Sequence, residues 1–275
     1  MRPVAFVALG FLWVACQSSI ESRLEEAREL VFRQRPEEAI AAYRSLLYAL
    51  EGQNDERAQK ARIEALSRIG DLSYLEKRDI EGAAEAYRTL IRIAPNAEEA
   101  FWAREKLAEI AHHHLRDLPE AISHWQVLAA SGREGAEQFA YRVARAYFES
   151  RDYEQCRKEC ENIVRTFPEG KVAQDALFLL ATSYQFEGRH EEAIAAFDRV
   201  EQRWPDTEIA ARARFQKGRA RMALGDPDGA LADYLEALKA HPDPERVQAE
   251  IARARRQVAE LQRIRKTDRR AAFQG

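Results

Sequence analysis

The sequence predicts an all-α protein built from repeated helical hairpins. Of its 275 residues, 46% are hydrophobic and 32% are charged, a balance that suits amphipathic helices with solvated outer faces. Val, Ile and Thr do not cluster into the alternating runs that strands require. A third observation fixes the architecture more closely, because the same short pattern returns six times along the chain.

Each copy of the pattern places a small residue four positions before an aromatic or apolar one. In four copies a proline follows twelve positions after the small residue, where it would stop a helix and begin the next hairpin. Successive copies lie 44, 38, 35, 37 and 37 residues apart. The six anchor pairs are Ala39 with Tyr43, Ala83 with Tyr87, Ala121 with Trp125, Cys156 with Cys160, Ala193 with Phe197, and Ala230 with Tyr234.

A second predicted helix precedes most of these anchors and carries a small residue where the two helices cross. Gly188 and Gly225 end two of these preceding helices, as a residue beyond a helix C-terminus commonly does. Small residues at a crossing let two backbones approach closely, and the ring fills the space between hairpins. The predicted crossing residues are Ala108, Ala144, Ala181 and Gly218.

This register resembles the tetratricopeptide repeat family over residues 20–242. The resemblance implies a right-handed α-solenoid of about six hairpins, each stacked on its neighbours because none can bury its apolar face alone. Val247, Ile251, Val258 and Leu261 then follow at helical spacing, so residues 243–275 are expected to form a capping helix with a basic tail.

The N-terminus has the form of an export signal followed by a lipid attachment site. Arg2 precedes an apolar run that ends at Ala15, too short for a membrane-spanning helix. Residues 1–15 are therefore a predicted signal peptide. Cys16 at its end resembles the modified cysteine of bacterial lipoproteins, with residues 16–20 as a short tether, although an ordinary cleaved signal is the alternative. Gln17 is not the Asp that retains many such lipoproteins at the inner membrane, so the resemblance implies the periplasmic face of the outer membrane.

In the family that the repeats resemble, the first helix of each hairpin lines an inner groove. A ladder of rings at intervals of 37 residues would lie there, with arginines beside it, and such a surface suits an extended or helical peptide segment. The alternative is that the rings pack against the adjacent hairpin. The predicted partner-binding groove consists of Tyr141, Arg145, Phe148, Phe178, Gln185, Phe186, Arg212, Phe215, Arg219 and Met222.

Motifs for catalysis, cofactors and metals are not found in the sequence. Cys156 and Cys160 occupy anchor positions, so they are predicted to fill the core, and two ligands make a poor zinc site. The three consecutive residues His112, His113 and His114 would point about 100° apart on a helix and could not share one ion. Neither a phosphate-binding glycine loop nor a nucleophile elbow is present. We expect neither an enzyme nor a small-molecule substrate.

Charge gives no reason to expect a nucleic-acid partner. The net charge of −3 provides no general attraction to phosphates. Residues 251–275 are locally basic, with eight Arg or Lys residues against Glu260 and Asp268, but aromatic residues for base stacking do not interleave with them before Phe273. A solvated capping helix is the predicted role of this segment.

An anchor joined to a repeat array resembles the BamD-like lipoproteins of β-barrel assembly and the Tol–Pal-associated periplasmic family. The expected function is therefore a lipid-anchored scaffold that binds other envelope proteins. Three alternatives remain open at this point: a pilotin-like lipoprotein for a pilus or secretion secretin, a soluble periplasmic adaptor of the Tol–Pal or peptidoglycan machinery, and an enzyme-associated module.

Overall fold

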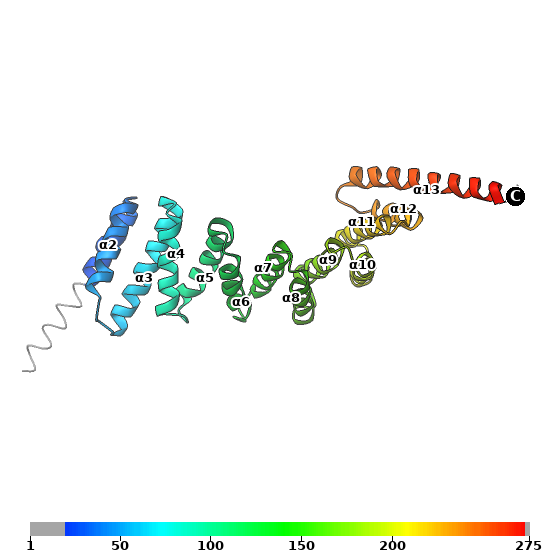
Figure 1. Ribbon diagram of the computed structural model, residues 1–275. Helices are drawn as coiled ribbons and strands as arrows, with labels where there is room; N and C mark the ends of the chain where they lie inside the picture. The colour runs from blue at the N-terminus through cyan, green and yellow to red at the C-terminus, as the bar shows by residue number, and fades with distance from the viewer. Residues whose placement is uncertain (1–19, 273–275) are drawn as a thin grey trace, which may run out of the picture. The chain divides into compact units, whose positions relative to one another are not determined.

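The computed structural model describes the backbone of residues 20–272 and the side chains of residues 20–267. The predicted signal peptide and Cys16 therefore lie outside the described residues. Every regular element between residues 20 and 272 is helical (Figure 1). The first helix ends at residue 32, and the later ones are α2 (Pro36–Ala49), α3 (Glu56–Leu72), α4 (Ile80–Ile93), α5 (Glu98–Ile110), α6 (Leu118–Ala129), α7 (Ala136–Glu149), α8 (Tyr153–Thr166), α9 (Lys171–Phe186), α10 (His190–Arg203), α11 (Glu208–Ala223), α12 (Pro227–Ala237) and α13 (Pro244–Ala272).

These helices form six successive hairpins and a final long helix, so the predicted all-α array of hairpins is confirmed. The helix over residues 20–32 pairs with α2, α3 with α4, α7 with α8, α9 with α10 and α11 with α12. α6 follows η2, and its Trp125 ring packs on His112 of that turn. The chain divides into two compact units, one ending at Leu128 and the other beginning at Ala129. None of the described helices is long and apolar enough to cross a membrane.

The six anchor pairs all lie in second helices, and every member is at most 3% exposed. The register predicted from the sequence is therefore confirmed, including the two copies that lack the proline. In the C-terminal unit, Cys156, Cys160 and Phe197 belong to one hydrophobic cluster that spans α7 to α11. Both cysteines are free thiols, as expected of core residues.

Close packing at the helix crossings explains the small residues of the first helices. A Cβ built on Gly218 would lie 2.5 Å from Cε1 of Tyr234, so only glycine fits this crossing without displacing the ring. Gly70 faces the ring of Tyr87 in the same way, a crossing residue that the sequence did not suggest. Ala144 and Ala181 are fully buried at the corresponding positions of α7 and α9.

Two first helices end in a π-helical turn, and these turns account for part of the irregular spacing. The turns are η1 (Ser73–Lys77) after α3 and η2 (Ala111–Leu115) after α5. A π-turn inserts one residue into a helix. Accordingly, the interval from the crossing residue to the second anchor residue is 17 residues in these two hairpins (from Gly70 to Tyr87, for example) and 16 in the hairpins of the C-terminal unit.

Candidate functional site

The predicted groove residues lie on the three first helices of the C-terminal unit. α9 contacts both α7 and α11, so the three helices form one continuous surface. The 37-residue interval brings equivalent positions of neighbouring helices to the same level of this surface. The individual side chains, however, differ widely in how much of them reaches the solvent.

Phe178 and Arg212 form the contact that links two hairpins across this surface. The Phe178 ring is half-buried and packs at 5.6 Å on the anchor ring of Phe197. The guanidinium carbon of Arg212, from the next hairpin, lies 4.8 Å from the centroid of the same ring. A cation above an aromatic face interacts favourably with the ring quadrupole. The Phe178 ring thus contacts both the core ring of Phe197 and the guanidinium of Arg212.

A second ring pair lies where α7 and α9 end. Phe148 and Phe186 are 5.3 Å apart in an edge-to-face arrangement, and Tyr153 contacts Phe148 at 5.5 Å. Phe186 is 67% exposed, although a phenylalanine usually buries most of its surface. Gln185 and Met222 are half-buried at the equivalent level of α9 and α11. Apart from Gln185, these side chains make an apolar edge that is open to solvent.

Phe215 does not contribute to an accessible surface. Its side chain is 2% exposed and belongs to the hydrophobic cluster that joins α11, α12 and α13. The ring packs against Tyr234 at 5.6 Å and His241 at 5.0 Å, and the guanidinium of Arg246 lies 5.4 Å above it. For Phe215 the structure therefore favours the alternative that the ring packs against neighbouring helices.

Tyr141 is also drawn toward the core. It is half-buried and packs against the cluster that contains Cys156 and Cys160. Burial, and after it the nearby carboxylate of Asp175, raises the pKa of Tyr141 to about 12. The hydroxyl is therefore neutral at physiological pH and can serve as a hydrogen-bond donor.

The two remaining arginines of the predicted groove are exposed. Arg145 pairs with Glu149 on the same helix at 3.3 Å, and Arg219 donates a hydrogen bond to Gln216 at 3.2 Å. Exposed pairs of this kind contribute little to stability and can exchange partners readily. Both arginines are thus accessible to a negatively charged ligand.

A pocket on the N-terminal unit was not predicted from the sequence. It has a volume of about 810 Å³ and is lined by residues from the first helices of three consecutive hairpins. Arg28 spans it with a bidentate bond to Glu64, both contacts at 2.7 Å. Arg68 makes no ion pair with another described side chain. The lining residues are Arg28, Lys60, Ile63, Glu64, Ser67, Arg68 and Glu99. The sequence could have indicated this pocket only through the shared position of these residues on first helices.

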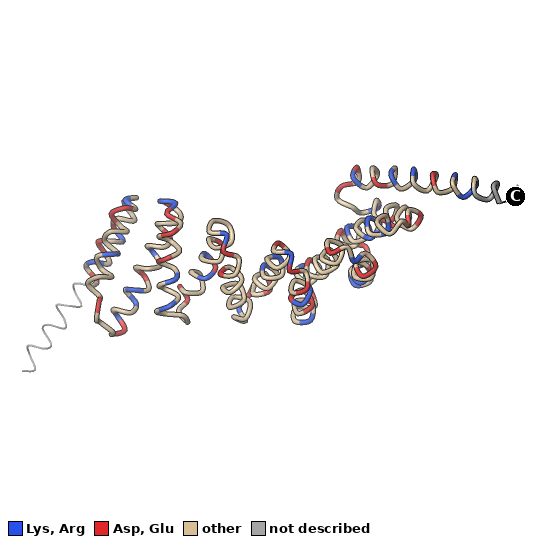
Figure 2. Tube along the Cα trace, in the orientation of Figure 1, with Lys and Arg blue, Asp and Glu red and all other residues tan. Residues whose placement is uncertain are grey.

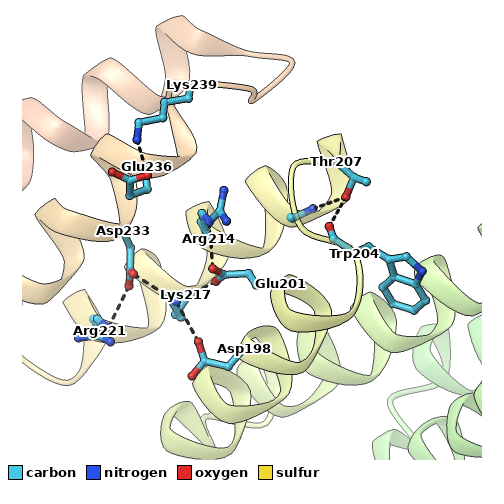
Figure 3. Close-up of polar contacts among 11 residues, drawn as sticks. Asp198, Glu201, Trp204, Thr207, Arg214, Lys217, Arg221, Asp233, Glu236 and Lys239 are labelled. Carbon is cyan, nitrogen blue, oxygen red and sulfur yellow. Dashed lines mark hydrogen bonds and ion pairs between the residues drawn. The ribbon is translucent and has the colours of Figure 1, made fainter.

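A buried lysine on α11, Lys217, contacts carboxylates from two neighbouring helices (Figure 3). The Lys217 ammonium donates to Asp198 at 2.9 Å and contacts Glu201 at 2.8 Å, both on α10. Asp233 on α12 lies 3.4 Å away. Burial alone would lower the pKa of Lys217, but these carboxylates outweigh it and raise the pKa. The amine is held charged, which is the opposite of what an amine nucleophile requires.

The histidine run on η2 does not converge on one point. The His112 ring packs on Trp125 at 5.3 Å, whereas the His114 ring packs on Tyr74 at 5.9 Å. Within the described part of the chain, no group of three His, Cys, Asp or Glu side chains is arranged to hold a metal ion.

Comparison with protein families gives matches to two models, both described as tetratricopeptide repeat. One matches residues 64–97, and the other matches three overlapping segments, 141–208, 178–245 and 215–263. The segments correspond to hairpins of the structure. A comparison with curated protein sequences gave no match.

Solved structures show the same fold at low sequence identity. The chain is similar to the MamA protein, with a TM-score of 0.51 and 21% identity over 68% of this chain and 96% of that one. It is also similar to the apo form of RapI, with a TM-score of 0.53 and 13% identity over 92% of this chain and 76% of that one. At these identities the likeness concerns the fold alone.

Proposed function

Because the chain belongs to the tetratricopeptide repeat family, whose models match more than half of it, we propose that it is a non-catalytic scaffold that holds segments of other envelope proteins. The fold itself is one of protein–protein interaction. The bacterial envelope as the location, the lipid anchor and the identity of the partners are further parts of the proposal.

The observation that carries the proposal is the exposed ring of Phe186 beside Phe148 at the edge of the first-helix surface. Aromatic side chains and arginines are enriched among the residues that anchor a bound partner. Phe178, which lies about two helical turns before Phe186 on α9, continues the same surface together with Arg212. The polar pocket of the N-terminal unit offers a second, chemically different surface on first helices.

A site-specific photo-crosslinker at Phe186 tests the proposal in cells. We expect crosslinks to a small set of envelope proteins, and we expect their loss when Phe178→Ala and Arg212→Ala are combined in the same chain. The matched control is the crosslinker at Tyr48, which is 76% exposed but lies on the second helix α2. Equal crosslinking from both positions, or none from Phe186, would contradict the proposal.

Phe215→Ala provides a separate control for folding. Because this ring is 2% exposed, its removal should cost about 3–5 kcal/mol of stability and lower the thermal melting temperature. The Phe178→Ala and Arg212→Ala chain should lose less stability than Phe215→Ala, because Phe178 is only half-buried. A groove variant that melts as early as Phe215→Ala would have lost its fold and not only its ligand.

The lipid anchor rests on Cys16, which lies outside the described residues. The apolar run that ends at Ala15 and the cysteine directly after it support lipidation, because a lone cysteine at a mature N-terminus would otherwise be an exposed thiol. Globomycin, which blocks cleavage of lipoprotein signals, should leave a membrane-held precursor of lower electrophoretic mobility, whereas Cys16→Ala should remove the lipid and change both mobility and fractionation. Unchanged fractionation and unchanged electrophoretic mobility would rule the anchor out.

The partner class that we place first is the machinery of β-barrel assembly, on the resemblance to BamD-like lipoproteins. The pilotin-like and Tol–Pal roles are the alternatives. The proteins recovered from the Phe186 crosslink decide among them, since barrel-assembly, secretin and Tol–Pal components are distinct. If none of these three groups is recovered, all three assignments are rejected. The scaffold role would then depend only on whether Phe186 crosslinks to other envelope proteins.

A further inference from the structure

The last helix is far longer than the hairpin on which it packs. α13 has 29 residues, whereas α11 has 16 and α12 has 11. Its first part is core: Val247, Ile251 and Ala254 are at most 6% exposed and join Phe215 and Tyr234 in one cluster. The helix continues beyond this cluster, and Figure 1 shows it running past the end of α12.

The apolar seam of α13 does not stop where the core stops. Ala254, Val258 and Leu261 follow at spacings of four and three residues, so they continue the stripe begun by Val247 and Ile251. Val258 and Leu261 are only partly buried and lie outside the cluster that contains Ala254. Beside them, Ile264 is 48% exposed. A seam that packs on helices in its first half is thus open in its second half.

Positive charge surrounds the open half. Arg255, Arg256, Arg265 and Lys266 are exposed and form no ion pair with another described side chain. Arg263 has only a long contact of 3.9 Å to Glu260. Figure 2 shows the basic residues of α13 in blue along its length. The segment 255–267 therefore combines a narrow apolar seam with a strong excess of cations.

We propose that residues 255–267 of α13 are a docking surface for an acidic amphipathic helix of a partner protein. The spacing of four and three residues fits helix-on-helix packing, which α13 already uses in its first half. Charge selects an acidic partner and disfavours a second copy of this chain, whose α13 would carry the same cations. This surface is distinct from the first-helix groove of the proposed function.

A bilayer surface fits the segment less well than a helix does. Membrane-surface helices bury a broad apolar face that usually includes large aromatic residues. Here the seam beyond Ala254 contains Val258 and Leu261, and the next position of the same stripe is Arg265. A cation in line with the seam opposes insertion into a hydrocarbon layer, whereas it can pair with a carboxylate of a facing helix.

Two synthetic helical peptides test the proposal against the full-length protein carrying Cys16→Ser. Both have 21 residues with Leu at the seam positions, and they differ only in carrying Glu or Lys at the flanking positions. Isothermal titration should show binding of the Glu peptide, at least about tenfold weaker binding of the Lys peptide, and a similar loss for the Glu peptide with Leu261→Asp. Ala259→Asp is the matched control, because this exposed residue lies off the seam.

The results that overturn the proposal are equally specific. Absence of binding by the Glu peptide, equal binding of both peptides, or equal losses from Leu261→Asp and Ala259→Asp would each reject it. Vesicles of phosphatidylglycerol that bind the protein and displace the Glu peptide would assign the surface to lipid instead. Since both substituted residues lie outside the core cluster, the melting temperature should stay unchanged and serves as the folding control.

Discussion

The hairpins α7–α8 and α11–α12 occupy equivalent places in the repeat but fill their helix crossing in opposite ways. In α11–α12 a large ring, Tyr234, faces a glycine, Gly218, which has no room for a Cβ. In α7–α8 the ring is replaced by Cys160, and the facing residue is Ala144. The volume at the crossing is thus shared between two positions, and neither position has a fixed residue type.

The difference extends to the ring carried by the first helix. With no ring at Cys160, Tyr141 packs toward the two thiols from α7. In α11–α12 both rings are present, and Phe215 stacks on Tyr234 at 5.6 Å. A ring at this register position is therefore not a marker of ligand binding by itself, because its exposure depends on the helices that pack around it.

The largest loss of stability should come from breaking the ion pairs that join α11 to α10 and α12. Lys217→Ala leaves Asp198, Glu201 and Asp233 without their common cation, and removing one partner of a buried pair typically costs about 3–5 kcal/mol. The control in the other hairpin is Lys158→Ala, which removes an exposed pair with Glu154. Urea unfolding followed by circular dichroism measures both variants. If both variants lose a similar free energy of unfolding, burial of the ion-pair network does not add to its contribution to stability.

A smaller loss is expected at the glycine crossing. Gly218→Ala places a methyl group against the Tyr234 ring, and overpacking of this kind costs about 1–3 kcal/mol. Thermal melting compares it with the wild type.

The same site allows the two crossings to be interconverted. In a Tyr234→Cys background, Gly218→Ala recreates the Ala144 and Cys160 pair of α7–α8. The substitution should then cost nothing and gain up to about 1 kcal/mol from helix propensity. The difference between the two backgrounds is the coupling energy of the pair. If Gly218→Ala is equally harmful in both, the shared-volume interpretation is wrong.

The turns between the paired helices predict a gain in stability. Arg151 ends α7 with a φ of 63°, whereas Gly225 ends α11 with a φ of 75°. Left-handed backbone is unfavourable for a residue with a side chain, so Arg151→Gly should stabilise the protein by up to about 1 kcal/mol. Gly225→Arg should destabilise the protein by a comparable free energy. Melting temperatures measure both, and a destabilised Arg151→Gly chain would mean that the arginine side chain outweighs its backbone cost.

The last prediction concerns the reactivity of the thiols in α7–α8 and involves no change in stability. A hydrogen bond that the Cys160 thiol donates to Cys156, together with burial, raises the pKa of Cys160 well above its ordinary value. The native protein carrying Cys16→Ser should react slowly with a thiol reagent at neutral pH, because the thiolate is the reactive form. Reaction should accelerate in urea as α7–α8 opens. Rapid labelling of the native chain would show that this hairpin opens locally.

The features that depend on short-range periodicity could be predicted from the sequence. The anchors from Ala39 to Tyr234 and the helix ends at Gly188 and Gly225 follow from side-chain size and backbone preference along one helix or turn. The groove was harder to predict, because the exposure of Phe215 and Phe178 is decided by helices that lie beyond their own hairpin. Phe215 is covered by α13, and that helix was expected only as a cap.

Features made of distant residues were not predicted. Lys217 meets carboxylates at positions 198, 201 and 233, which share no pattern in the chain until α10, α11 and α12 are packed. The π-turns add a single residue each, which changes a spacing without changing composition. Gly70 was missed although Ala108, which lies at the same interval of 17 residues from its ring, was predicted.

The equal step of 37 residues in the last three hairpins has an evolutionary consequence. Phe197 and Tyr234, like Gly188 and Gly225, are separated by that same interval, so one hairpin can be superimposed on the next along the sequence. Duplication of a 37-residue segment within this region would create a new hairpin whose two interfaces match those already present. The chain could thus have lengthened, or could lengthen, by whole hairpins without redesign of its neighbours.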